Sequence, residues 1–320
     1  MHLPPDHALA AAVANAHAEA QKVTGGANAN YIPYLASVPP DLLGVAIVTR
    51  NGAIFEAGDS RYEFAIESLS KVATLALVME EIGPEAVRRK IGADPTGLPF
   101  NSIVALELHN GKPLSPLVNA GAITAASLVA GGGADDRWAR ILSMQSRLAG
   151  RQIALLDALN QSEQSTNFHN RAIAWLLYSA GICKGDPMVA LDIYTRQCST
   201  LITTVDLAAI GATLANAGAN PLTGERVISA KNVPPILAEM TMEGLYTASG
   251  DFAYTIGLPA KSGVGGGIVA VAPGQMAVAA FSPPIDAAGN SVRGLAAVRF
   301  VARALELNLF ADGRPDMLGA

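Results

Sequence analysis

The sequence predicts an α+β fold in which both ends of the chain build one antiparallel sheet. Two hairpin signals carry this prediction: Asn51-Gly52 near the N-terminus and Pro273-Gly274 near the C-terminus. The long segment between them has mostly helical patterns. We therefore expect terminal helices to flank the sheet, an all-helical domain to be inserted between its halves, and an active site in the crevice between the two parts. The predicted domains are 1–80 plus 220–320 for the sheet and 81–219 for the helices.

The expected strands follow from β-branched and continuous apolar runs. Residues 43–49 form a buried strand, and residues 53–58 return after the Asn51-Gly52 turn. Residues 263–272 and 275–281 form the second hairpin. Helices are expected at about 6–22 and 292–309, beside the sheet. The helical segments expected between the hairpins are 119–129, 135–148, 153–159, 170–180, 187–197 and 205–217.

Composition narrows the class of protein. The chain has 320 residues, of which 50% are hydrophobic and 15% charged, so we expect a globular protein with a sizeable core. A net charge of −5 argues against a nucleic-acid partner. Cys183 and Cys198 are too few for a disulfide framework, and the histidines do not cluster with the spacing of a metal site. Without a signal peptide or a membrane-length apolar run, a cytoplasmic protein with no membrane partner is expected.

One Ser-x-x-Lys motif, Ser68 to Lys71, opens an apolar helical run. Residues three apart share a helix face, so the two side chains can meet. A serine hydroxyl needs a base to act as a nucleophile, and burial lowers the pKa of a lysine enough for it to be that base. The alternative is that Ser68 caps the helix and Lys71 is solvated. Because Lys71 lies among apolar residues, we favour the catalytic interpretation.

A second signal, Lys261-Ser262-Gly263, stands at the start of the expected 263–272 strand. A lysine and a hydroxyl at a sheet edge can bind a substrate carboxylate, and the N–H of Val264 could serve an oxyanion hole. The alternative is a turn before a glycine-rich core strand. Together with Ser-x-x-Lys, this order of motifs points to serine acyl transfer of the penicillin-recognising type.

Further segments occur in a characteristic order along the chain. These are Phe100-Asn101-Ser102-Ile103, Val118-Asn119-Ala120-Gly121, Ser162-Glu163, Asn170-Arg171-Ala172, Leu191-Asp192-Ile193-Tyr194, Gln197-Cys198-Ser199 and Gly244-Leu245-Tyr246. With the two motifs, they closely resemble the bacterial-type, serine-dependent glutaminases of the beta-lactamase and penicillin-binding-protein superfamily. The resemblance runs from about Gly25 to the last expected helix.

The resemblance implies an amidohydrolase that converts L-glutamine to L-glutamate and ammonia on a beta-lactamase/transpeptidase-like fold. It implies Ser68 as the nucleophile, Lys71 as the base and Tyr194 as a group that helps to move protons. It implies no metal or organic cofactor, and a homodimer or homotetramer. The substrate contacts that it implies are Ser68, Asn119, Glu163, Asn170, Tyr194, Tyr246 and the backbone of Val264.

Residue chemistry agrees with these contacts. A carboxylate such as Glu163 suits the α-ammonium of glutamine, while amide and hydroxyl groups suit its carboxylate and side-chain amide. Each residue taken alone has a structural alternative: Asn119 and Asn170 as helix caps, Tyr194 as a core aromatic, Glu163 as a first-turn charge. Two rival functions stay open at this point, a beta-lactam-directed serine acylase or hydrolase and a non-catalytic amino-acid-binding protein.

The chain also differs from the usual sequence of that family at several positions. Glu67 stands where glutamine is usual, and Glu243 where cysteine is usual. Leu114 and Ser115 replace arginine and asparagine, and Thr247 replaces aspartate. The expected site residues are unaffected, so these departures bear on substrate preference, rate and subunit contacts.

Overall fold

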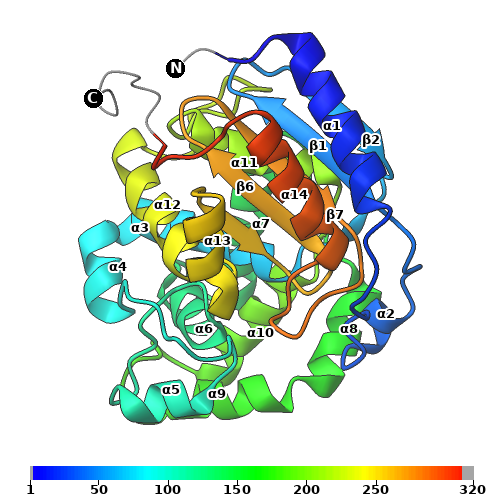
Figure 1. The fold of residues 1–320 in the computed structure, drawn as a ribbon. Coiled ribbons are helices and arrows are strands. Elements are labelled where there is room, and N and C mark those ends of the chain that lie inside the picture. The colour runs from blue at the N-terminus through cyan, green and yellow to red at the C-terminus, as the bar shows by residue number, and fades with distance from the viewer. Residues whose placement is uncertain (1–2, 312–320) are drawn as a thin grey trace, which may run out of the picture.

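The centre of the fold is a five-stranded antiparallel sheet, seen in a computed structural model that describes residues 3–311. Its strand order is β2-β1-β7-β6-β5. Strand β1 (Gly44–Thr49) pairs with β7 (Met276–Phe281), so the two ends of the chain meet in mid-sheet (Figure 1). The flanking strands are β2 (Ile54–Gly58), β6 (Gly267–Ala272) and β5 (Ala260–Ser262). The predicted α+β fold class is confirmed.

Helices cover both faces of this sheet. On one face, α1 (Asp6–Ala20) and α14 (Val292–Ala304) pack against the side chains of Val45 and Ile47. On the other face, α11 (Thr204–Ala215) packs against β1, β6 and β7. Because β1 alternates, its neighbouring residues Ala46 and Val48 belong to this second core.

We propose the division into a sheet domain and a helical domain that the sequence predicts. The segment 81–219 supplies most of the helices, but α11 at its end lies on the sheet, so the two proposed parts share one core. The ends of the predicted sheet domain, residues 1–2 and 312–320, lie outside the described residues.

The remaining elements build the helical side of the molecule. They are α2 (Pro33–Ala36), β3 (Phe64–Ala65), α3 (Ser70–Ile82), α4 (Pro84–Lys90), α5 (Ile103–Leu108), α6 (Asn119–Leu128), α7 (Ala134–Ala149), α8 (Asp157–Thr166), α9 (Phe168–Ser179), α10 (Pro187–Cys198), β4 (Leu201–Ile202), α12 (Val233–Glu243) and α13 (Ser249–Thr255), with 3₁₀ turns at Glu67–Leu69, Ala230–Asn232 and Tyr246–Ala248.

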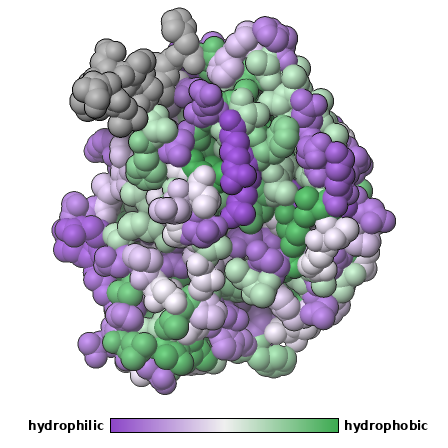
Figure 2. Space-filling model, viewed as in Figure 1, coloured by the Kyte–Doolittle hydropathy of each residue, from purple (hydrophilic) through white to green (hydrophobic). Residues whose placement is uncertain are grey.

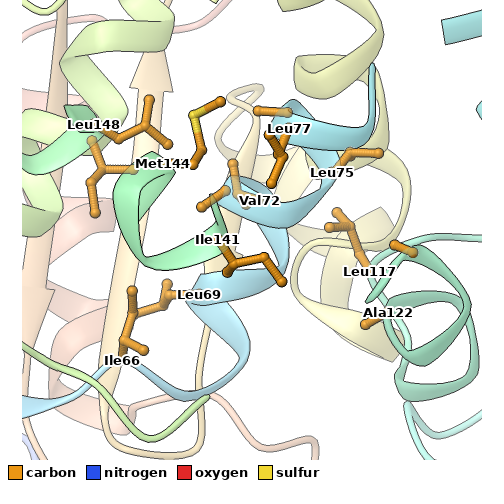
Figure 3. Close-up of a cluster of buried hydrophobic side chains, with 14 of the residues drawn as sticks. Ile66, Leu69, Val72, Leu75, Leu77, Leu117, Ala122, Ile141, Met144 and Leu148 are labelled. Carbon is orange, nitrogen blue, oxygen red and sulfur yellow. The ribbon is translucent and has the colours of Figure 1, made fainter. Parts of the chain in front are cut away.

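Helix α3 is the central helix of this side, and every residue from Ser70 to Met79 is buried. Its apolar side chains meet α6 at Ala122 and α7 at Ile141 and Met144 (Figure 3). A helix that is apolar on all sides has no solvent face, as the sequence indicates. Its start is therefore held rigidly between neighbouring helices.

Two segments differ from the sequence expectation. Residues 153–156 are extended rather than helical, because Leu155 forms a β-bridge with Thr200; the helix begins only at Asp157. Residues 263–266 form a turn, so the expected 263–272 strand is shorter and begins at Gly267. Gly266 makes that turn possible, since its φ of 101° is open to glycine.

The surface view shows polar and apolar residues mixed over the visible face. Hydrophobic residues gather at the lower left, over α5, where Val104 and Leu108 are 52% and 66% exposed (Figure 2). Over residues 3–311, none of the helices combines the length and the apolar character needed to span a bilayer.

Candidate active site

The residues around Ser68 are placed by a short strand and a 3₁₀ turn. Strand β3 pairs with β4, and the turn Glu67–Leu69 follows it directly, ahead of α3. Glu67 has a φ of 49°, a left-handed conformation that non-glycine residues rarely adopt and that is often found at functional sites. The α3 cap position is Leu69, and no side chain caps it. Ser68 is therefore not an N-cap, which removes the structural alternative for this serine.

Lys71 is buried among aromatic rings. Its side chain is 1% exposed, and Nζ lies 6.0 Å from the ring centre of Phe100 and 5.9 Å from those of Tyr194 and Tyr246. Nζ donates a 2.7 Å hydrogen bond to Oδ1 of Asn119. Burial lowers the pKa of Lys71 to about 8, although nearby acidic groups and the Cys198 thiol oppose the shift. A lysine in this position is partly neutral near physiological pH.

Three of the sequence-predicted polar residues form one hydrogen-bond chain with Lys71. Asn119 is the first residue of α6, and its Oδ1 also accepts a 3.1 Å bond from the Tyr194 hydroxyl of α10. Its Nδ2 donates to Oδ1 of Asn170 in α9 at 2.9 Å. Four separate helices therefore converge on the Asn119 amide. Neither asparagine is used as a helix cap, because both are bonded to one another.

Tyr246 joins Ser68 to the end of the sheet. It has a φ of 58°, its hydroxyl donates to the carbonyl of Ser262 at 3.3 Å, and the nearby Ser68 hydroxyl opposes the rise in the pKa of Tyr246 that burial causes. Lys261 Nζ lies 4.2 Å from the Tyr246 ring centre. The Ser68 hydroxyl thus lies near a tyrosine, whereas Lys71 is hydrogen-bonded to Asn119.

Lys261 and Ser262 differ from the expectation that they bind a substrate carboxylate. Nζ of Lys261 donates to the carbonyls of Gly244 and Ser262 at 3.0 and 2.6 Å. Ser262 Oγ donates to Oδ1 of Asn290 at 2.6 Å. Both side chains are fully buried with protein partners, so in this structure they hold the 244–246 segment and the 290 loop against β5.

The turn between β5 and β6 closes on the Ser68 backbone. A Cβ atom on Gly263 would lie 3.3 Å from the backbone nitrogen of Ser68, and one on Gly265 would lie 2.5 Å from the carbonyl of Ala65. Glycines at these positions allow the turn to approach. Val264 is buried between them, which brings its backbone to the same side as Ser68.

A pair of carboxyl groups completes the floor of the site. Glu67 and Glu163 are 3% and 8% exposed, and their carboxyl groups lie close enough to shift each other's pKa. Burial and the neighbouring Glu163 raise the pKa of Glu67 well above its usual value. Burial also raises the pKa of Glu163, to about 7, against hydrogen bonds from Glu67 and Ser199 that lower it. Glu163 is therefore no first-turn surface charge.

A cavity of about 570 Å³ opens above these groups. Of the residues predicted from the sequence, Asn119, Glu163 and Asn170 line it. The other predicted site residues do not line it, but Lys71 and Tyr194 are hydrogen-bonded to Asn119, which does. Residues that were not among the expected substrate contacts form the rest of the wall: Tyr31, Ile32, Pro99, Phe100, Asn101, Thr166, Asn167, His169, Ile285, Asp286, Ala287 and Gly289.

Some of these wall residues carried a visible signal. Tyr31 belongs to a polar-aromatic segment after α1. Phe100 and Asn101 belong to one of the segments that resemble the glutaminases. The 285–289 loop carried none, although four of its residues line the cavity and Gly289 packs near Phe100, Tyr246 and Val264. In the described part of the chain, no group of three or more His, Cys, Asp or Glu side chains is arranged to hold a metal ion.

Comparisons with known proteins agree on one family. A family model described as Glutaminase matches residues 26–310. A glutaminase from Brucella canis is 67% identical over 303 residues, covering 95% of this chain and 96% of that relative. The solved structure titled probable glutaminase ybaS has a TM-score of 0.95 and 62% identity, covering 96% of this chain and all of that one. A structure of Mglu in its glutamate form has a TM-score of 0.89 and 35% identity, covering 98% and 71%.

Proposed function

The chain belongs to the glutaminase family and is an amidohydrolase, and on this premise we propose that it hydrolyses L-glutamine through an acyl-enzyme on Ser68. One observation carries the proposal most directly. Lys71, buried and with its pKa lowered to about 8, lies three residues from Ser68, under a cavity lined by Asn119 and Glu163. The site therefore groups a nucleophile, a base and polar side chains that can bind an amino acid, which is what an acyl-transfer active site requires.

In the first half-reaction, neutral Lys71 accepts the Ser68 proton as Oγ attacks the γ-carboxamide carbon. The resulting oxyanion is held by the backbone N–H groups of Ser68 and Val264. The tetrahedral intermediate then breaks its C–N bond, ammonia leaves with a proton returned from Lys71, and a glutamyl ester stays on Ser68. Support for Lys71 comes from its lowered pKa; its bond to Asn119 rather than Ser68 fits a resting enzyme, in which catalytic contacts are often not yet formed.

In the second half-reaction, water attacks the ester carbon and gives its proton to Lys71. Ser68 leaves as an alkoxide that takes this proton back, and L-glutamate is released. We propose that Tyr194 assists these transfers, because its hydroxyl shares the Asn119 oxygen with Lys71. We propose that Tyr246 orients the resting Ser68 hydroxyl, which lies near enough to affect the pKa of Tyr246.

The substrate's polar ends would meet complementary groups. The α-ammonium pairs with Glu163, the carboxylate on the cavity wall. The α-carboxylate and the amide contact Asn119, Asn170 and the tyrosine hydroxyls. A glutamate-bound form of Mglu is among the similar structures, which supports an amino-acid ligand for this site.

Ammonia release from L-glutamine by the purified protein tests the function. We expect turnover with glutamine, much less with asparagine, and loss of about 1,000-fold or more in Ser68→Ala. Undiminished turnover in that variant would contradict the assignment of Ser68 as the nucleophile. A chromogenic cephalosporin distinguishes the beta-lactam-directed alternative, and glutamine binding by calorimetry without ammonia release would favour the non-catalytic one.

We also propose that the chain assembles as a homodimer or homotetramer. Exposed large apolar side chains on α5 and α9 support this, including Leu108, Phe168 and Trp175 at 66%, 69% and 53% exposure. Light scattering after gel filtration tests it, and a monomer at micromolar concentration would contradict it.

A further inference from the structure

The carboxyl pair formed by Glu67 and Glu163 does more than supply charge. We propose that Glu67 works as a protonated positioning residue, donating the hydrogen bond that keeps the Glu163 carboxyl ionised and available to the substrate's α-ammonium. This inference rests on the proposed function, and it assigns Glu67 a role that is separate from attack or proton transfer at the amide.

The geometry of the pair requires a proton. Glu67 and Glu163 are both buried and close enough to shift each other's pKa, and two such carboxyl groups repel each other strongly when both are ionised, so one of them keeps its proton. The second partner of Glu163 is the hydroxyl of Ser199, whose Oγ lies 3.3 Å from Oε1. Glu163 therefore receives two donors, one from each side.

The surroundings decide which carboxyl keeps the proton. Glu163 lines the cavity and has Ser199 as a donor, so its negative charge is compensated. Glu67 does not line the cavity, and its Oε1 is buried without a partner. Its side chain is enclosed by the β5–β6 turn, since a Cβ on Gly265 would lie 3.2 Å from Glu67 Cγ. A charge on Glu67 would be poorly compensated there, so the proton belongs on Glu67.

The titratable groups around the pair fit this assignment. Burial and the neighbouring Glu163 raise the pKa of Glu67 well above its usual value, and the neighbouring tyrosines and thiol also have raised pKa values, so they are neutral. Lys71 is the basic group that acts on both carboxyls. The groups that face the pair are Lys71 from α3, Tyr194, Cys198 and Ser199 at the end of α10, Tyr246 from the 3₁₀ turn and Tyr31 from the segment after α1.

A pH effect with a defined sign follows. As the pH falls through about 7, Glu163 takes up a proton and loses the charge that holds the α-ammonium, so the KM for glutamine rises. A hydrogen bond to the ionised form favours that form. Removing the donor at residue 67 therefore makes Glu163 protonate more readily, and the rise in KM moves to higher pH.

Two variants of the same shape separate donation from packing. Glu67→Gln keeps an N–H donor, and Glu67→Met fills the space without one. We expect Glu67→Gln to keep a KM within about threefold of wild type, whereas Glu67→Met raises KM about tenfold or more at pH 7, with a smaller change in kcat. Glu239→Gln is the control: Glu239 is a buried carboxyl on α12, bonded to Ser115 at 2.9 Å, and should leave KM and its pH dependence unchanged.

A second measurement applies even if Glu67→Met does not fold. Calorimetry of L-glutamate binding at pH 7, in buffers of different ionisation enthalpy, counts the protons released from the pair. Wild type and Glu67→Gln should release the same number, because Glu67 is protonated before and after binding.

The outcomes are distinct. A KM raised as much by Gln as by Met, or an unequal proton count in the Gln variant, would mean that Glu67 is ionised and overturn the proposal. A normal KM in both variants would remove any role for the donor. Absence of ammonia release by the wild type would instead refute the proposed function itself.

Discussion

Two buried lysines, Lys71 at the start of α3 and Lys261 in β5, place Nζ 5.9 and 4.2 Å from the centre of the Tyr246 ring. Burial lowers the pKa of both. Lys261 donates hydrogen bonds to two backbone carbonyls, whereas Lys71 donates to one side-chain amide and otherwise faces aromatic rings. The difference teaches that a lowered pKa does not identify a base. The contacts of the amine decide whether it can accept and return a proton.

Removing each amine in turn tests whether Lys71 is the base and Lys261 is structural, and this test has the largest expected effect. Lys71→Met should lower kcat/KM for glutamine by about 100- to 10,000-fold, which is the usual range for loss of a general base. Folding should be retained, since Met fills a similar apolar space. The measurement is steady-state ammonia release, with circular dichroism as the check on folding. A loss of less than about tenfold would remove Lys71 from the base role.

The matched change Lys261→Met should act mainly on stability. It removes the buried amine's hydrogen bonds to the carbonyls of Gly244 and Ser262, and only Tyr246 then donates a side-chain bond to the second one, so we expect a loss of about 1–3 kcal/mol in the free energy of unfolding. Activity should fall by about tenfold at most, through the shifted Tyr246 ring. Urea unfolding at pH 7 measures the first effect. If Lys261→Met instead abolished turnover in a stable protein, the roles of the two lysines would have to be exchanged.

The pH dependence of kcat/KM gives a further test of the difference between the two lysines, with a smaller expected effect. Lys71 acts as a base only when neutral, so kcat/KM should fall as the pH drops through about 8, where the amine takes up a proton. Asn119→Asp places a carboxylate against Nζ, which favours the charged amine, and should move this fall upward by about one pH unit or more.

Asn290→Asp is the control for that shift. It introduces the same carboxylate beside Ser262, in the region of Lys261. The fall in kcat/KM should keep its wild-type position. An equal shift in both variants would show that the profile does not report Lys71.

The sequence was informative about elements and poor about contacts. Both hairpins, the terminal helices and the buried character of α3 could be predicted, because each depends on a local pattern. Lys71 was expected to bond Ser68, three residues away, but its partner Asn119 is 48 positions away. The choice between the two depends on how α6 approaches α3, which no spacing rule contains.

The site shows the same limit in two further places. Glu67 was visible as a charge beside the nucleophile, but its bond to Glu163 depends on a left-handed backbone angle and on the packing of α8. The cavity wall at 285–289 arises from a loop with no local pattern of its own. Residue types were therefore predictable from motifs, and their partners were not.

The central claim is that Ser68 carries a glutamyl ester during turnover. A γ-aryl ester of L-glutamate tests it most directly, because its good leaving group makes acylation fast and allows the ester intermediate to accumulate. Wild type should release about one aryl alcohol per active site in a burst, and acid-quenched protein should carry one glutamyl group on the peptide containing Ser68. Linear release without a burst, with no such adduct in an enzyme that turns over, would contradict the account.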